Sequence, residues 1–171
     1  MEFQVGCNWQ DFQQYYQGLD DYFTRNGVDD VTVGEVGNTE AWIIKEDPAH
    51  LIIWLVDSAI VGHAIWHETS TEEHRLGDAR DAADRTLLRE FFGGKQEGLV
   101  ELHELWLKTE YRGRGYGKLF FEFFESFMRQ QGVRGIIHYS DHPAVKALCR
   151  RRGYKEGYLK EEGWDVFGLS L

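Results

Sequence analysis

Three side chains that can accept a proton lie within one short segment, Glu101-Leu102-His103-Glu104. Carboxylates and imidazoles are common general bases, so Glu101, His103 and Glu104 are the first candidates for a catalytic role. In a regular β-strand Glu101 and His103 share one face and Glu104 lies on the other, whereas a β-bulge would change this arrangement. The alternative interpretation is a solvated strand face on which the two glutamates only carry charge.

A glycine-rich turn, Arg112-Gly-Arg-Gly-Tyr-Gly117, follows this segment between an expected strand and an expected helix. Glycines let a backbone approach a ligand closely, and N–H groups at a helix start attract anions, so the turn is suited to a phosphate or a pyrophosphate. It does not match the Walker loop, because Leu119 follows Lys118 where Ser or Thr is required. Its GxGxG spacing also differs from the GxGxxG of dinucleotide-binding folds. A tight turn without a ligand is the alternative.

With these residues the chain resembles the GNAT superfamily of acyl-CoA-dependent N-acetyltransferases. Residues 105–117 look like that family's signature loop, with an arginine, a glycine three residues later and another glycine two residues after that. Residues 142–154 are similar to a second family motif, and the resemblance covers residues 51–154 apart from a charged insertion.

The resemblance implies that acetyl-CoA is the co-substrate and that the turn holds its pyrophosphate on backbone N–H groups. A backbone group of Leu107 would pair with the pantetheine arm, and the backbone N–H of Leu105 would polarise the thioester carbonyl. The cofactor-binding residues implied in this way are Leu105, Leu107, Arg112, Gly113, Arg114, Gly115, Tyr116 and Gly117.

The implied reaction is direct attack of an amine on the thioester, which requires no covalent enzyme intermediate. A protonated amine is not nucleophilic, so a base is needed. Glu101 stands 11 residues before Arg112, where histone-type members of the family carry a glutamate, and is the first choice. His103 or Glu104 would take its place if the strand is bulged.

The departing CoA thiolate needs a proton, and many family members place a tyrosine beside it. Cys149 occupies that position here. A thiol can protonate a thiolate of similar basicity, so Cys149 is a candidate general acid, although a small cysteine buried in a helix is also typical. Tyr139, Tyr154 or solvent are the alternatives. His142, before Pro143, is expected at a helix N-cap or on the surface.

The 171-residue chain is long enough for one domain, residues 1–171, with a sizeable core. Its 19 basic and 29 acidic residues give a net charge of −10, which disfavours nucleic acid or anionic membranes as partners and favours a cationic acceptor. Cys7 and Cys149 are far apart without a CxxC motif, and the other histidines show no ligand spacing, so no disulfide framework and no metal site are expected. The absence of a signal-like start or a membrane-length apolar run predicts a cytoplasmic protein without a membrane partner.

The apolar periodicity predicts an α/β fold with a mixed, mostly antiparallel sheet of about seven strands flanked by helices. Helices are expected from Asn8 to Asn26, within the charged insertion at residues 69–98, after Gly117, and from Pro143. The helix after Gly117 should turn Glu122, Glu125 and Arg129 to water. Strands are expected at residues 41–45, 51–56, 59–66, 100–107, 136–139, 154–159 and 164–169. Acetyl-CoA should lie in a wedge between strands 100–107 and 136–139.

These observations favour an N-acetyltransferase that moves an acetyl group from acetyl-CoA to a primary amine. The acceptor would be a small cationic amine, such as a polyamine or aminoglycoside, or a protein amine. The alternative is an acyl-CoA-binding regulatory module that keeps the fold without the reaction. The sequence gives no oligomeric state, although members of the family often form homodimers.

Overall fold

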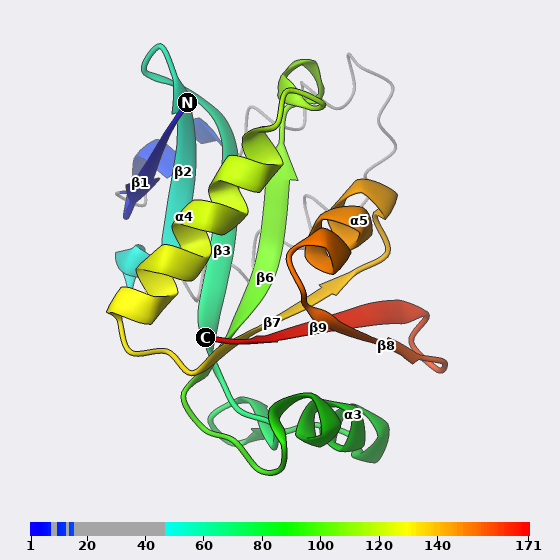
Figure 1. The fold of residues 1–171 in the computed structure, drawn as a ribbon. Helices are drawn as coiled ribbons and strands as arrows, with labels where there is room; N and C mark the ends of the chain where they lie inside the picture. Colours follow the sequence, from blue (N-terminus) through cyan, green and yellow to red (C-terminus); the bar gives the residue numbers. More distant parts are fainter. Residues whose placement is uncertain (8–9, 13, 16–46) are drawn as a thin grey trace. The chain divides into compact units, whose positions relative to one another are not determined.

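The computed structural model describes residues 1–7, 10–12, 14–15 and 47–171 of the chain (Figure 1). These residues belong to two compact units, the first comprising Met1–Ile65 with Glu104–Lys108 and the second Trp66–His103 with Thr109–Leu171. Strands β3 (Ala59–Thr69) and β6 (Leu99–Leu107) each contribute residues to both units. The single domain expected from the chain length stays a prediction.

Seven strands form one sheet in the order β1-β2-β3-β6-β7-β9-β8. Strands β6 and β7 (Gly135–Ser140) pair in parallel, whereas β1–β2, β2–β3, β7–β9 and β8–β9 are antiparallel. This confirms the predicted mixed, mostly antiparallel sheet of about seven strands.

The first unit contains β1 (Glu2–Val5), the short 3-10 helix η1 (Pro48–His50), β2 (Leu51–Val56) and the start of β3. Its core consists of Phe12, Leu51, Ile53 and Ile65. The strands predicted at residues 51–56 and 59–66 are confirmed, and the second continues to Thr69. Strand β1 was not predicted, since its four residues carry too little pattern. The strand expected at residues 41–45 and most of the helix expected from Asn8 lie outside the described residues.

Gly62 of β3 allows the close approach of β6 in this unit. A Cβ atom at Gly62 would lie 2.6 Å from the carbonyl oxygen of Trp106. Any side chain there would push the two backbones apart, so the position requires glycine.

The second unit holds the other helices and strands. In chain order they are β4 (Glu73–Arg75), β5 (Asp78–Ala79), α3 (Ala82–Phe92), the 3-10 helix η2 (Thr109–Tyr111), α4 (Tyr116–Gln130), β7, α5 (Pro143–Arg151), β8 (Lys155–Leu159) and β9 (Trp164–Ser170). The helices expected in the insertion, after Gly117 and from Pro143 are present. The hairpin β4–β5 was not predicted, because strands of three and two residues are too short to show a period.

Helices α3 and α4 cover opposite faces of β7. Leu88 and Phe91 of α3 form a core cluster with Ile137 of β7. The next residue, His138, contacts the ring of Phe121 in α4, with ring centroids 6.4 Å apart. Successive strand residues point to opposite faces, so each helix has its own face of the strand.

One surface prediction for α4 was wrong. Glu125 does not face water but is buried, with only 4% of its surface exposed. Its carboxylate accepts hydrogen bonds from Arg152 at 2.6 and 2.7 Å. The helical period placed Glu125 at the edge of the apolar face, and a cation from α5's C-terminal end makes its burial favourable there.

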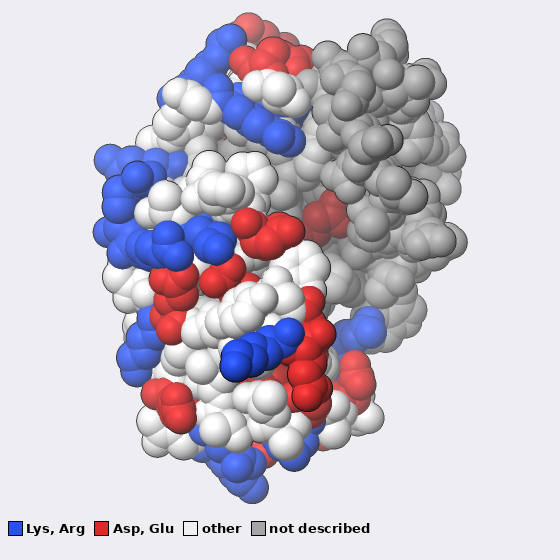
Figure 2. All heavy atoms as spheres, turned by 90° about the vertical axis from the view of Figure 1, so that its right-hand side faces the viewer, with Lys and Arg blue, Asp and Glu red and all other residues white. Residues whose placement is uncertain are grey.

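Acidic and basic side chains are interspersed over the described part of the face drawn in Figure 2. The net charge of −10 is therefore not concentrated in one acidic surface on that part of the molecule. Among the described residues, no helix combines the length and the apolar character needed to cross a bilayer.

Candidate functional site

The glycine-rich turn leads into α4, as the sequence predicts, but the 3-10 helix η2 and not a strand directly precedes it. Gly113 and Gly115 have φ angles of 72° and 84°, and Gly115 is the N-cap of α4. A Cβ atom at either position would meet nothing within 4 Å, so glycine is needed for the backbone conformation and not for space.

The start of α4 is available to an anion. Residues 112–115 are exposed, and within the described chain no side chain caps the helix at Gly115. The first N–H groups of a helix have no partner inside the helix, and a phosphate can satisfy them. The turn is therefore not blocked by its own side chains.

The parallel ladder between β6 and β7 is short. It runs from Leu99↔Gly135 to Leu102↔His138, while β7 continues to Ser140 through its pairs with β9. The ladder ends three residues before Leu105. The wedge expected for acetyl-CoA stays a prediction. Leu105 and Leu107 lie in the remaining part of β6.

Glu101 lies in a buried polar cluster of the second unit. Its side chain is 9% exposed, and the Nδ1 atom of His103 is 3.3 Å from its Oε1 atom. His103 itself is more open, with 32% of its side chain exposed. The second carboxylate oxygen, Oε2, is 3.8 Å from Nε2 of His67 and 3.5 Å from Nη2 of Arg80. The sequence prediction that Glu101 and His103 share a strand face agrees with this contact.

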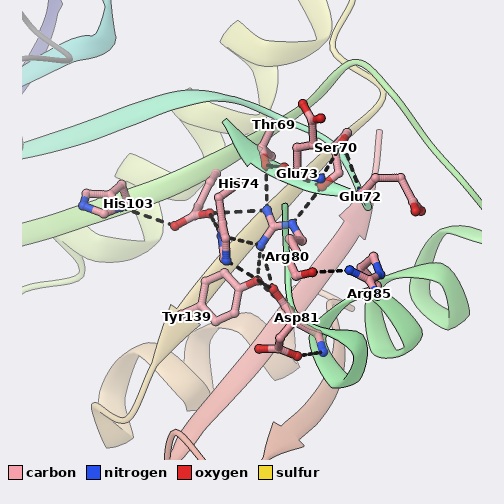
Figure 3. Close-up of polar contacts among 12 residues, drawn as sticks. Thr69, Ser70, Glu72, Glu73, His74, Arg80, Asp81, Arg85, His103 and Tyr139 are labelled. Atoms are coloured by element: carbon pink, nitrogen blue, oxygen red, sulfur yellow. Dashed lines mark hydrogen bonds and ion pairs between the residues drawn. The ribbon is translucent and has the colours of Figure 1, made fainter. Parts of the chain in front are cut away.

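Arg80 is the centre of this cluster, and its side chain is fully buried. It lies within hydrogen-bond distance of groups from several elements, as Figure 3 shows. These groups are the carbonyl oxygen of Ser70 at 2.9 Å, Oγ1 of Thr69 at 2.6 Å, Nδ1 of His74 at 2.8 Å, Oδ2 of Asp84 at 2.8 Å and the hydroxyl of Tyr139 at 2.7 Å.

The surroundings of Glu101 favour its charged form. Burial raises the pKa of this carboxyl, but the hydrogen-bond contacts with His103 and His74 lower it by more, so that the pKa lies below its ordinary value. Glu101 is thus a carboxylate at neutral pH. A carboxylate whose pKa is lowered is a weaker proton acceptor than an ordinary carboxylate.

Glu104 belongs to a different group, in the first unit. Its Oε1 atom is 2.5 Å from Nε2 of His63, and Nδ1 of that histidine is 3.1 Å from the hydroxyl of Tyr15. The ring of Trp106 stacks on His63 with the centroids 6.1 Å apart. The three predicted base candidates are therefore divided between two groups, Glu101 with His103 and Glu104 with His63.

Cys149 is completely buried in α5. Burial raises the pKa of its thiol to about 12. A thiol with this pKa is a poor proton donor to a thiolate whose ordinary pKa is about 8.5. The hydroxyl of Tyr154 is 3.3 Å from Glu125, and that of Tyr139 donates to Asp84 at 2.8 Å. Burial raises the pKa of both tyrosines.

One set of side chains has the types of a metal site. His67, Glu101 and His103 each offer a ligand atom, and these atoms lie within 4.8 Å of one another. The guanidinium of Arg80, 3.5 Å from the carboxylate of Glu101, already supplies a positive charge and would repel a second cation. The expectation that the protein has no metal site stays a prediction.

The sequence interpretation missed the buried partners of Glu101. His67 could have been found by continuing the two-residue alternation of the 59–66 strand past Trp66, since β3 does continue. His74 and Arg80 gave no such signal, because the hairpin that contains His74 and directly precedes Arg80 is too short to show a period. His142 is the N-cap of α5 by position, and its exposed side chain makes no capping hydrogen bond within the described residues.

Comparison with known proteins identifies the family. A family model described as the acetyltransferase (GNAT) family matches residues 12–154. No protein with a curated description matches the chain. Solved structures match its fold. One is an acetyltransferase from Thermus thermophilus, with 16% identity, coverage of 100% of this chain and 98% of that one, and a TM-score of 0.63.

Two further matches are insect proteins. A mosquito arylalkylamine N-acetyltransferase-like protein, 5b, has 12% identity, coverage of 99% of both chains and a TM-score of 0.67. A Drosophila melanogaster polyamine N-acetyltransferase has 15% identity, coverage of 76% of this chain and 79% of that one, and a TM-score of 0.53. At these identities the structures support the fold, and the family model covers most of the chain. The chain therefore belongs to the GNAT family of acetyltransferases, whose fold binds acetyl-CoA.

Proposed function

We propose that the protein transfers the acetyl group of acetyl-CoA to a primary amine and that the pair of His103 and Glu101 accepts the proton of that amine. The observation that carries this proposal is the contact between the buried carboxylate of Glu101 and the partly exposed imidazole of His103, both on the strand that precedes η2 and the glycine-rich turn. Arg112 to Gly117 would hold the pyrophosphate on backbone N–H groups.

The pairing defines which nitrogen of His103 reacts. An ionised carboxylate only accepts hydrogen bonds, so Nδ1–H of His103 donates to Glu101, and the lone pair of the neutral ring is on Nε2. Nε2 takes one proton from the substrate ammonium, and the carboxylate stabilises the imidazolium that forms. Glu101 therefore acts through His103 and does not itself need a high pKa.

The remaining steps follow from the thioester. The neutral amine attacks the carbonyl carbon, polarised by the N–H of Leu105, and forms the C–N bond. The C–S bond then breaks, and the CoA thiolate leaves. The second proton of the amine nitrogen passes through solvent to the thiolate, and His103 returns its proton to solvent. Cys149 has no part in this scheme.

A cationic acceptor fits the charge of the cluster. Arg80 contributes one positive charge, whereas Asp84 and Glu101 contribute two negative charges, so one negative charge is left to attract an ammonium group. The names of the insect structures, an arylalkylamine and a polyamine N-acetyltransferase, support an amine as the acceptor class of this fold. The acceptor would be a small cationic amine, of the polyamine or aminoglycoside kind, or a protein amine.

The test is free-thiol release from acetyl-CoA with a panel of primary amines, each paired with the alcohol of the same carbon skeleton. We expect release with amines, a product that is heavier by one acetyl group, and no release with the alcohols. Release with the alcohols alone would refute N-acetylation. Binding of acetyl-CoA by calorimetry without release across the panel would favour the acyl-CoA-binding module, which the high pKa of Cys149 and the carboxylate contacts of Tyr139 and Tyr154 support.

A further inference from the structure

We propose that Arg80 is a positioning residue of the transfer reaction, which fixes the carboxylate of Glu101 behind His103 and balances its charge. By this proposal the insertion that carries Arg80 completes the proton-accepting pair. The inference rests on the proposed role of His103 and Glu101.

Hydrogen bonds to several elements hold the side chain of Arg80 in one position. Its Nε and Nη2 atoms donate to the end of β3, at the carbonyl oxygen of Ser70 and Oγ1 of Thr69. Thr69 in turn donates to the carbonyl oxygen of Glu73 in β4 at 2.8 Å. The Nη1 atom contacts Asp84 of α3 and Tyr139 of β7. The planar guanidinium thus contacts residues of β3, β4, α3 and β7 in the second unit and lies 3.5 Å from the carboxylate of Glu101.

Glu101 needs such a partner because it is buried. Its Oε2 atom has no hydrogen-bond partner within the described residues, and the guanidinium at 3.5 Å supplies the nearest fixed positive charge. An isolated carboxylate in this position would take up a proton rather than stay charged. A protonated Glu101 could not stabilise the imidazolium of His103.

Charged and titratable groups face Glu101 from every element packed against it. They are His67 of β3, His74 of β4, Arg80 before α3, His103 of β6 itself and Tyr139 of β7. Asp84 of α3 contacts Arg80 and His74, Arg75 of β4 acts on His67, and His138 lies on the other face of β7. Burial lowers the pKa of His67 and of His138, which keeps these two imidazoles neutral. Arg80 is therefore a permanent cation within 3.5 Å of the Glu101 carboxylate, opposed by the carboxylates of Asp84 and Glu101.

Removal of the Arg80 charge should shift the acid limb of the pH profile in one direction. Without Arg80 the two carboxylates are unbalanced, so Glu101 and His103 both hold a proton up to a higher pH. The pair must lose that proton before it can accept one from the amine. The acid limb of the pH profile of kcat/KM should therefore move to higher pH. Removing the negative charge of Asp84 should move it in the opposite direction.

The experiment compares the pH profiles of four variants of the full chain. We expect Arg80→Met to raise the midpoint of the acid limb by about one pH unit, since a single charge within 4–6 Å shifts a pKa by roughly 1–3 units. Arg80→Lys should restore most of the wild-type midpoint, and Asp84→Asn should lower it. Arg89→Met is the matched control, because Arg89 pairs with Glu72 at the surface of the same insertion and should leave the midpoint unchanged.

A purely structural role gives a different result. Loss of activity at every pH in Arg80→Met, with the acid limb unmoved and no rescue by Arg80→Lys, would overturn the proposal. If Arg80→Met does not fold, an Asp84→Asn midpoint that stays in place or rises would overturn it as well. Titration of the imidazole of His103 by NMR in the same variants gives the shift without turnover. It therefore tests Arg80 even if no amine is acetylated, which separates failure of this proposal from failure of the proposed function.

Discussion

Glu101 and Glu104 are three residues apart in one strand, yet their surroundings give them different chemistry. Glu101 is buried beside Arg80 and contacts a partly exposed imidazole, whereas Glu104 contacts His63, whose side chain is only 1% exposed. A carboxylate behind an exposed imidazole can pass a proton to and from a ligand. The carboxylate of Glu104, whose partner is the buried imidazole of His63, instead makes a hydrogen bond inside the protein.

The isosteric pair Glu101→Gln and Glu104→Gln tests this difference. We expect Glu101→Gln to lower kcat by about 10²- to 10⁴-fold, the range found for general acid–base catalysis, because a neutral amide cannot stabilise the imidazolium of His103. Glu104→Gln should leave kcat within about tenfold of the wild type. Thiol release at saturating acetyl-CoA gives both values, and thermal unfolding checks that both variants fold. A larger loss in Glu104→Gln would assign the proton acceptor to the Glu104–His63 pair.

Cys149→Ala tests the general acid. Because burial raises the pKa of this thiol to about 12, Cys149 should not donate a proton at neutral pH, and kcat should be unchanged in the alanine variant. Loss of a small buried side chain should lower the free energy of unfolding by about 1 kcal/mol. Cys7→Ala, which changes a partly buried cysteine of the first unit, is the control. A drop in kcat of more than about tenfold, which is about 1.4 kcal/mol of barrier, for Cys149→Ala alone would restore the acid role.

At the scale of elements, the strands and helices with a clear period were predictable. Strands β2, β3, β6 and β7 and helices α3, α4 and α5 lie where apolar spacing, glycine stops and Pro143 put them. The short elements β1, β4 and β5 were not predictable, because two to four residues do not define a period. The partner of β1, strand β2, is also distant in the sequence, whereas β4 and β5 pair with each other.

The same limit applies to the candidate site. Glu101, His103 and the Arg112–Gly117 turn could be proposed because they are local patterns on one strand and its following turn. The buried cation Arg80 could not, since it reaches Glu101 through a hairpin and a tertiary contact across 21 positions of the chain. Burial of Glu125 was missed for the same reason, because its partner Arg152 is in another helix.

A substitution in the turn between η2 and α4 tests whether this turn binds acetyl-CoA. Gly115 has a φ of 84°, and a valine there would cost about 1–3 kcal/mol or force the turn into another conformation. If the turn holds the pyrophosphate, Gly115→Val should weaken acetyl-CoA binding by at least about tenfold, the equivalent of about 1.4 kcal/mol. Isothermal titration calorimetry measures this change.

A second glycine provides the control for the turn. Gly163, between β8 and β9, has a φ of 75°, and a Cβ atom there also meets nothing within 4 Å. Gly163→Val should therefore lower the melting temperature as Gly115→Val does, while it leaves the affinity for acetyl-CoA unchanged. Equal affinity in the two variants would show that the Arg112–Gly117 turn does not bind the pyrophosphate.

At the scale of the whole molecule, several ionisable side chains are held away from their ordinary pKa in the same direction. Burial lowers the pKa of His67 and His138, so both are neutral in the folded protein. The histidine contacts of Glu101 outweigh its burial and lower its pKa as well. In all three cases the unfolded chain binds a proton at a higher pH than the folded protein does. The free energy of unfolding should therefore fall as the pH falls.

The pH range over which the free energy of unfolding falls is set by the pKa values of the same groups in the unfolded chain. The two histidines stabilise the fold fully above the unfolded imidazole pKa of about 6.5, and Glu101 does so above the unfolded carboxyl pKa of about 4.3. Urea unfolding between pH 8 and pH 4 should give a constant midpoint down to about pH 7, a first decline below about pH 6.5 and a steeper one below about pH 4.5. His67→Gln should reduce the first decline, because one of the two buried imidazoles is then absent. A midpoint that stays constant from pH 7 to pH 5 would contradict the buried neutral histidines, and with them the charge balance around Glu101.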